Sequence, residues 1–257
     1  MKSLVLLLFV LGQTASESPA TPPGLHAHND YYHKKPLIEA LELGFDSVEA
    51  DVFLSKDDLL IGHFSVELRP ERSLKKLYLE PLAKMHETKT LKPMWLLVDI
   101  KSADGVAAAK LLSKQLAEFP GLFCRWDNDA PDKAPVKVIL SGNMPIAWVK
   151  AQTSRQICLD GREPDLGIAG KTGVTPWVSE PWTKHFTFKG KGEMPADQKE
   201  KLKAMASKAE AAGQQLRFWG APDTPDTWKA QKDAGVQRVG TDKLSDLKKF
   251  VDKKGAE

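Results

Sequence analysis

The chain has 257 residues, of which 42% are hydrophobic and 28% are charged, and its formal net charge is +3. This composition is that of a globular protein with a core of ordinary size, and it argues against a disordered or fibrous chain. The basic residues are spread along the sequence without a patch that alternates with aromatic residues, so we expect no nucleic-acid partner.

The amino terminus has the order of a secretory signal peptide. Lys2 precedes an apolar run at residues 4–11, and small and polar residues follow at 12–16. The apolar run is too short to anchor the chain stably in a bilayer. We therefore expect a signal peptide at residues 1–20 and export to the periplasm or the extracellular space; a hydrophobic N-terminal strand is the alternative.

The rest of the chain has no long internal linker, so we expect one domain at residues 21–257. It contains two cysteines, Cys124 and Cys158, which are able to form a disulfide in an exported protein. The sequence does not decide whether that bond forms.

Short apolar runs alternate with segments of helical period along this domain, which is the order of repeated βα units. The predicted strands are residues 24–28, 47–53, 59–63, 94–101, 136–141, 156–160, 174–178, 216–220 and 237–241. The predicted helices are residues 36–43, 74–87, 106–119, 144–152, 195–212, 224–234 and 245–253. A (β/α)₈ barrel needs one strand fewer, and we expect the run at 174–178 to be a loop or an added edge.

Two acidic side chains share one face of the strand predicted at 47–53. Glu49 and Asp51 alternate with three aliphatic residues, so the acids point to one side and the aliphatic residues to the other. The carboxyl end of a barrel strand is where catalytic groups lie. Two like charges repel, and burying them is unfavourable unless a cation compensates. We therefore expect Glu49 and Asp51 to bind a divalent cation.

Asp99 and Lys101 repeat this arrangement at the end of the strand predicted at 94–101. Their spacing places both side chains on one face. Asp99 is a candidate third carboxylate ligand, and Lys101 is a candidate contact for a substrate phosphate. A structural Asp99–Lys101 ion pair is the alternative.

Three histidines lie at the ends of predicted strands. His26 and His28 share a face at the end of the first strand, and His63 closes the run at 59–63. A single histidine in such a place is usually structural, but here histidines and carboxylates end successive strands. The pattern predicts acid–base groups and metal ligands that converge at one mouth of a barrel.

Several segments resemble successive motifs of the phospholipase C-like phosphodiesterase superfamily, which includes glycerophosphodiester phosphodiesterases and phosphatidylinositol-specific phospholipases C. The likeness runs from about residue 24 to residue 251, and the branch that the chain resembles most is the altered inheritance of mitochondria protein 6 group. The segments are His-Ala-His-Asn-Asp-Tyr at 26–31, Pro-Leu-Ile-Glu-Ala-Leu at 36–41, Val-Glu-Ala-Asp-Val at 48–52, Gly-His at 62–63, Val-Asp-Ile-Lys at 98–101, Phe-Trp-Gly-Ala-Pro-Asp-Thr at 218–224 and Gly-Thr-Asp at 240–242.

This resemblance implies a (β/α)₈ barrel, one divalent cation, Ca²⁺ or Mg²⁺, and two histidines that act as general acid and base. Glu49, Asp51 and Asp99 match the metal carboxylates of the superfamily, and His63 matches its second catalytic histidine. The His-Arg-Gly start and the Glu-Asn-Thr motif of the glycerophosphodiesterases are absent from this sequence.

The first catalytic histidine has two candidates. His28 and Asn29 resemble the His-Asn pair of the phospholipases, in which the asparagine joins the metal, whereas His26 is the other histidine able to occupy that place. We favour His28 because it lies nearer the carboxyl end of its strand. His26 is then expected to support the site or to contact the phosphate.

The resulting hypothesis is a metal-dependent phosphoric diester hydrolase that acts on a glycerophosphodiester or phospholipid-type substrate. Trp219 is a candidate wall for the alcohol or lipid portion, with barrel packing as the alternative, and Arg162 is a candidate contact for an anionic group, with a surface ion pair as the alternative. We expect at most transient contact with a membrane surface. Two other classes remain open: a metal hydrolase of the amidohydrolase or polymerase-histidinol-phosphatase type, since His26 and His28 resemble its first metal pair, and a non-catalytic exported binding barrel.

Overall fold

The computed structural model describes residues 23–168 and 173–254. The predicted signal peptide lies outside the described residues. Within them, no helix is long and apolar enough to cross a bilayer.

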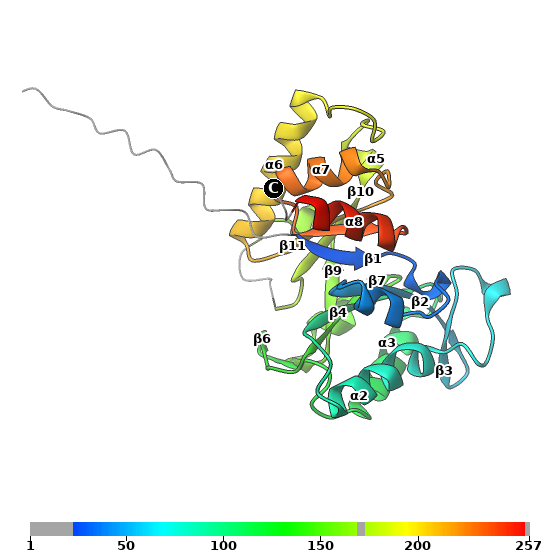
Figure 1. Cartoon of the computed structure of the whole chain (residues 1–257). Coiled ribbons are helices and arrows are strands. Elements are labelled where there is room, and N and C mark those ends of the chain that lie inside the picture. The colour runs from blue at the N-terminus through cyan, green and yellow to red at the C-terminus, as the bar shows by residue number, and fades with distance from the viewer. Residues whose placement is uncertain (1–22, 169–172, 255–257) are drawn as a thin grey trace, which may run out of the picture.

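Eight parallel strands close into a barrel (Figure 1). The barrel strands are β1 (Gly24–Ala27), β2 (Ser47–Ser55), β4 (Met94–Ile100), β7 (Val136–Gly142), β9 (Ile157–Gly161), β10 (Trp177–Pro181), β11 (Gln215–Trp219) and β12 (Arg238–Thr241). Each strand pairs with its neighbours in this order, and β1 completes the circle by pairing with both β12 and β2. The predicted (β/α)₈ barrel is confirmed.

Helices surround the barrel. The α-helices are α1 (Ile38–Glu42), α2 (Glu80–Glu87), α3 (Gly105–Ala117), α4 (Ile146–Lys150), α5 (Trp182–His185), α6 (Ala196–Ala211), α7 (Pro225–Asp233) and α8 (Leu244–Lys254). Shorter turns are η1 (Asp30–Tyr32), η2 (Ser65–Glu67), the π-helix η3 (Lys75–Leu79) that leads into α2, and η4 (Glu163–Asp165). Two of the helices begin with a side-chain cap: Asp104 accepts a hydrogen bond from the Ala107 amide at the start of α3, and Thr224 accepts one from the Thr227 amide at the start of α7.

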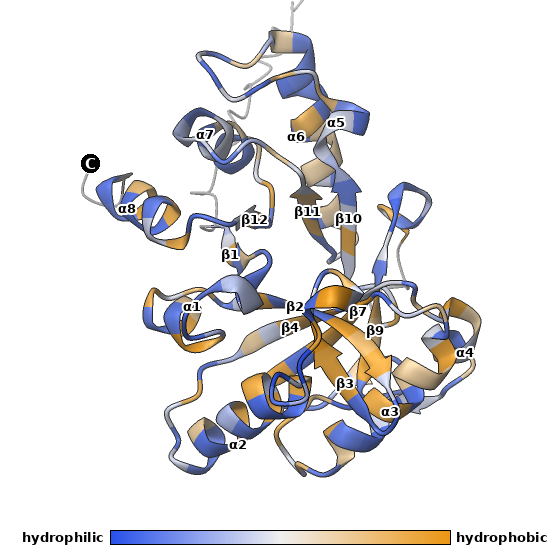
Figure 2. Ribbon diagram, turned by 90° about the vertical axis from the view of Figure 1, so that its right-hand side faces the viewer, coloured by the Kyte–Doolittle hydropathy of each residue, from blue (hydrophilic) through white to orange (hydrophobic). Residues whose placement is uncertain are grey.

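The core lies mainly between the barrel wall and the helices. Val48, Ala50 and Val52 on β2 are fully buried in it, together with aliphatic residues of α3 such as Leu112. Full burial of such an aliphatic side chain contributes about 1.5–3 kcal/mol relative to exposure. In Figure 2 strands β3 and β7 carry mostly hydrophobic residues, whereas α7 is mostly hydrophilic. The aliphatic face of β2 therefore packs outward, and its acidic face is turned into the barrel.

The prediction that residues 174–178 lie outside the barrel was wrong. Residues 58–61 form β3 (Asp58–Ile61), which pairs antiparallel with the end of β2 and stays outside the closed barrel. The connection is a turn at Lys56 and Asp57, and a turn this short can join only antiparallel strands. The run predicted as a loop or edge at 174–178 overlaps the barrel strand β10, which begins three residues later and pairs with β9 and β11.

Three two-residue strands, β5 (Trp126–Asp127), β6 (Ala130–Pro131) and β8 (Ser154–Arg155), form a separate small sheet. Nearby, Cys124 and Cys158 are both buried and their thiols are free. Burial raises the pKa of each thiol to about 12. The Cys158 thiol donates a hydrogen bond to the Gly173 carbonyl at 3.0 Å. The structure thus contains these residues as buried thiols rather than as a disulfide.

Candidate active site

A pocket of about 240 Å³ opens at the carboxyl ends of the barrel strands. It brings together most of the predicted site residues, while His26 and Asp51 do not line it. The lining residues are His28, Asn29, Glu49, His63, Asp99, Lys101, Ser141, Gly142, Asp160, Arg162, Arg217 and Trp219.

Three carboxylates converge beside this pocket. Asp51 and Asp99 are register partners on the neighbouring strands β2 and β4, so their side chains enter the barrel at the same level. Glu49, Asp51 and Asp99 each offer a carboxylate oxygen, and these oxygens lie within 4.8 Å of one another. Among residues 23–168 and 173–254, Oδ1 of Asp51 and Oδ1 of Asp99 are buried without a hydrogen-bond partner. Oxygen donors at this spacing, with two orphaned atoms, fit a hard divalent cation such as Ca²⁺ or Mg²⁺.

The raised pKa values of two of these carboxyl groups also fit a site for a cation. Burial, together with the charge of Glu49, raises the pKa of Asp51 above its ordinary value. Burial raises the pKa of Asp99 to about 6, with further contributions from Asp51 and Glu49 that oppose the lowering by Lys101. The carboxylates therefore repel one another in the absence of an ion, and a bound cation would relieve that repulsion.

Lys101 and Gly142 fix the two aspartates. The Lys101 ammonium lies 3.1 Å from Oδ2 of Asp51 and 3.2 Å from Oδ2 of Asp99. Gly142 has φ +68°, and a Cβ atom at this position would lie 2.0 Å from Oδ1 of Asp99. Only glycine leaves room for that carboxylate. Lys101 thus forms the ion pair that was the alternative interpretation, and its contact with a substrate phosphate stays a prediction.

Glu49 is held by a buried arginine that the sequence analysis did not single out. Oε2 of Glu49 lies 2.9 Å from Nη2 of Arg217 and 3.0 Å from Nε2 of His26. Burial alone would raise the pKa of Glu49, but the Arg217 charge and the hydrogen bond to His26 hold it well below its usual range. Arg217 lies two residues before Trp219 on β11, so the alternation of strand side chains was the signal that could have found it.

His26 is fully buried below the pocket and both of its ring nitrogens are engaged. Nδ1 lies 2.8 Å from the Ser47 hydroxyl, and Nε2 contacts Glu49. Burial, reinforced by the Arg217 charge, lowers the pKa of His26 to about 3. His26 is therefore neutral at ordinary pH and orients Glu49. His26 and His28 contact different carboxylates, Glu49 and Asp242.

His28 pairs with an aspartate at the end of the last barrel strand. Nδ1 of His28 lies 2.8 Å from Oδ1 of Asp242, and the Asn29 amide nitrogen lies 3.0 Å from the same ring nitrogen. Burial lowers the pKa of His28, but the Asp242 hydrogen bond and the Glu49 charge outweigh it, so the pKa lies above its ordinary value. Asp242 belongs to the Gly-Thr-Asp segment of the sequence, but its role beside His28 was not predicted.

His63 reaches the site from the segment after β3 rather than from a barrel strand. Its Nδ1 lies 2.7 Å from Oδ2 of Asp51. The Tyr31 hydroxyl lies 2.8 Å from the same Asp51 oxygen and 2.8 Å from Oδ1 of Asn29. Asn29 has φ +49°, a left-handed conformation that asparagine tolerates better than most residues. Tyr31 therefore links Asn29 to Asp51, a role that the sequence analysis missed although Tyr31 ends the quoted His-Ala-His-Asn-Asp-Tyr segment.

Arg162 and Trp219 form the far wall of the pocket. Nη1 of Arg162 lies 3.0 Å from Oδ2 of Asp160, and Nη2 lies 3.3 Å from the Ser141 hydroxyl. Trp219 is 45% exposed at the end of β11, which excludes the alternative of packing inside the barrel. Both side chains are placed to touch a bound molecule, and those contacts stay predictions.

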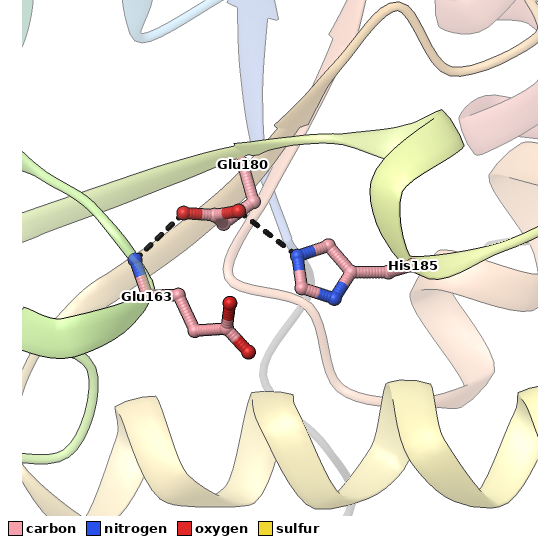
Figure 3. Close-up of side chains that lie close together, drawn as sticks. All are labelled: Glu163, Glu180 and His185. Atoms are coloured by element: carbon pink, nitrogen blue, oxygen red, sulfur yellow. Dashed lines mark hydrogen bonds and ion pairs between the residues drawn. The ribbon is translucent and has the colours of Figure 1, made fainter.

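A second group of potential ligands lies away from this pocket, where Glu163, Glu180 and His185 come together (Figure 3). Here the Lys184 ammonium lies 2.8 Å from both Oε2 of Glu163 and Oε2 of Glu180. His185 also contacts Glu180, at 2.9 Å. Among the described residues, this group has no buried oxygen without a hydrogen-bond partner, whereas Asp51 and Asp99 each have one, so the group at Glu49 is the stronger candidate for a metal centre.

The sequence of this chain is similar to those of one group of known proteins. The model of the AIM6-like phosphodiesterase domain matches residues 16–91. Altered inheritance of mitochondria protein 6 from Eremothecium gossypii is 29% identical over 88% of this chain and 69% of its own length. The homologue from Arthroderma benhamiae is 27% identical over 89% of this chain and 84% of its own length.

Solved structures include a similar fold. The glycerophosphodiester phosphodiesterase from Agrobacterium tumefaciens superposes with a TM-score of 0.52 and 10% sequence identity, covering 90% of this chain and 99% of that one. This likeness concerns the barrel fold alone. Together with the sequence matches it confirms the resemblance to the altered inheritance of mitochondria protein 6 branch and supports a phosphodiesterase.

Proposed function

Starting from the resemblance to the AIM6-like phosphodiesterases, we propose that this chain is a metal-dependent phosphoric diester hydrolase that uses His28 and His63 as its acid–base pair. The observation that carries the proposal is the grouping of Glu49, Asp51 and Asp99 between two histidines that are each oriented through Nδ1 by an aspartate. The substrate class is a glycerophosphodiester or a phospholipid-type diester.

Glu49, Asp51 and Asp99 would hold one Ca²⁺ or Mg²⁺ ion, and the Asn29 side-chain oxygen is a further candidate ligand. When bound, the cation stabilises negative charge on a non-bridging phosphate oxygen. The orphaned Oδ1 atoms of Asp51 and Asp99 support this assignment because they are buried and lack any other partner. Lys101 holds the opposite oxygens of the same two aspartates, and it supports the same phosphate through its charge.

The two histidines would move the protons. One accepts a proton from the attacking oxygen, which is that of water or of a neighbouring substrate hydroxyl, and the other protonates the leaving oxygen. His28 and His63 both use Nδ1 to contact an aspartate, so Nε2 is the nitrogen for proton exchange in each ring. The burial of His26 and the contacts of both its nitrogens support the choice of His28 over His26 for this role.

The net charge of the site with a divalent cation bound would complement the negative charge of a phosphodiester. Its carboxylates are Glu49, Asp51, Asp99, Asp160 and Asp242, and its permanent cations are Lys101, Arg162 and Arg217. A divalent cation balances the two excess negative charges. A protonated His28 then supplies the single positive charge that complements the one negative charge of a phosphodiester. The leader-like residues 1–20 support export of this activity.

The test is turnover by the purified mature chain. Glycerophosphodiesters, phosphoinositides and lysophospholipids are incubated with Ca²⁺ or Mg²⁺ or with a chelator, and products are identified by ³¹P NMR. We expect cation-dependent hydrolysis that His63→Ala abolishes while ligand binding remains. Full activity after exhaustive chelation would reject the metal role, and ligand binding without turnover of any diester would identify a binding barrel instead.

A further inference from the structure

We propose that an apolar rim beside the catalytic mouth, formed by Tyr32, Phe64 and Val66, docks onto the surface of a phospholipid membrane. The substrate class of the proposed hydrolase then narrows to a lipid phosphodiester presented in that surface. This narrowing rests on the proposed function, whereas the docking itself is measurable without turnover.

The rim contains the most exposed large apolar side chains of the described residues. Val66 is 79% exposed, Phe64 is 60% exposed and Tyr32 is 58% exposed, and the remaining side chains of this kind are less exposed. Single exposed apolar residues are common on soluble proteins, but the highest exposures here fall on two adjoining segments. An exposed grouping of aromatic and aliphatic side chains is typical of a surface that contacts lipid or another protein.

Specific contacts join the two segments and hold the rim beside His63. The Tyr32 hydroxyl donates to Oε1 of Glu67 at 2.9 Å, and Arg72 donates to the Tyr31 carbonyl at 2.6 Å. Oε2 of Glu67 accepts hydrogen bonds from the amides of His63 and Phe64. The rings of His63 and Phe64 are 4.7 Å apart. The apolar side chains therefore adjoin the group that we assign to proton transfer.

The charges around the rim favour a membrane as the occupant. Lys34, Lys35 and Arg69 are exposed on the same two segments, and Glu67 keeps its negative charge within the rim, where its carboxylate accepts three hydrogen bonds. Glu71 is an exposed acidic residue of these segments. Apolar side chains flanked by an excess of cations match a bilayer that offers an acyl region beneath anionic headgroups.

Sedimentation with vesicles tests the docking. The wild-type chain is mixed with vesicles of phosphatidylcholine, with or without phosphatidylglycerol, and the bound fraction is measured against lipid concentration. Phe64→Ser/Val66→Ser should bind about tenfold more weakly or worse, because two apolar side chains no longer enter the lipid. Ile146→Ser, which changes a side chain that is 46% exposed at the start of α4, is the matched control and should bind like the wild type.

Further variants separate the contributions of electrostatic attraction, apolar contact and catalysis. Lys34→Gln and Lys35→Gln should each weaken binding about fivefold on the anionic vesicles alone. Val66→Glu should lose vesicle binding and lipid turnover but hydrolyse a soluble diester such as bis(p-nitrophenyl) phosphate at the wild-type rate. His63→Ala should still bind vesicles, so a failure of the proposed hydrolase would leave the docking result intact.

Two outcomes would overturn the docking proposal. One is equal vesicle binding by the wild type and by Phe64→Ser/Val66→Ser, including no binding by either. The other is a wild-type dimer in sedimentation velocity that the same double variant converts to a monomer, which would make the rim a contact between two copies of the chain.

Discussion

Asp51 and Asp99 face each other across two neighbouring parallel strands, and Lys101 bridges their Oδ2 atoms, while both Oδ1 atoms are buried and have no hydrogen-bond partner in the described part of the chain. The lysine therefore compensates only one side of the pair. The other side is the place for the proposed cation, and the first prediction concerns it.

A divalent cation should raise the thermal stability of the chain through Asp51 and Asp99. A ligand that binds only the folded state adds about 2.7 kcal/mol at a hundredfold excess over Kd. Asp51→Asn should remove the Ca²⁺- or Mg²⁺-dependent rise in Tm, as seen by calorimetry with and without chelator. Glu163→Gln, in the second group, where Lys184 contacts both glutamates, is the control and should keep the rise. The reverse pattern would move the metal centre to that second group.

His28 and His63 should be needed for turnover and His26 for stability. His28→Ala or His63→Ala should reduce kcat by at least about 10²-fold, and the double variant should lose far less than the product of the single effects. His26→Ala removes one buried hydrogen-bond partner from Ser47 and one from Glu49, which keeps Arg217, and this costs about 1–3 kcal/mol of unfolding free energy. Kinetics at matched metal saturation decide the assignment, and a larger kcat defect in His26→Ala than in His28→Ala would contradict it.

The His28–Asp242 pair should make stability depend on pH. The pKa of His28 in the folded chain lies above its ordinary value of 6.5, so protonation favours the folded state. This contribution is fully present below pH 6.5, down to the titration of Asp242, and is lost as pH rises through the raised pKa of His28. Asp242→Asn should therefore destabilise the chain more at pH 6 than at pH 9 in urea unfolding. An equal loss of unfolding free energy at both pH values would show that His28 and Asp242 do not form an ion pair.

Arg217 should be the most sensitive charged residue of the barrel interior. Arg217→Met leaves Glu49 buried without its cationic partner, and breaking a buried ion pair in this way costs about 3–5 kcal/mol. Lys229→Met, which breaks an ion pair with Asp233 that is exposed on both sides, should lose no more than about 1 kcal/mol. Chemical denaturation measures both, and similar losses would mean that Glu49 finds another partner.

The barrel and the grouping of Glu49, Asp51 and Asp99 were predictable because both depend on local patterns. Alternation along β2 separates Glu49 and Asp51 from the aliphatic residues, and a parallel barrel gathers the strand ends at one mouth. The same reasoning, applied to β11, would have predicted that Arg217 points inward beside Trp219.

Other features depend on contacts between segments far apart in the sequence. The pairing of His28 with Asp242 joins residues 214 positions apart, and no single strand pattern reveals it. The error over which of residues 59–63 and 174–178 belongs to the barrel has a different cause. Both are short apolar runs, and only the length of the turn before Asp58 shows that β3 must fold back on β2.

The closure of the barrel through β1 and β2 has a consequence for how relatives can diverge. Because β1 pairs with β2 directly, the sheet is complete without β3, and the β2–β3 hairpin is an appendage to it. Insertions or deletions between β3 and α2 alter neither the number of barrel strands nor their register. The segment with His63, Phe64 and Val66 can thus be exchanged as a module, while the carboxylates of β2 and β4 remain anchored in the closed sheet.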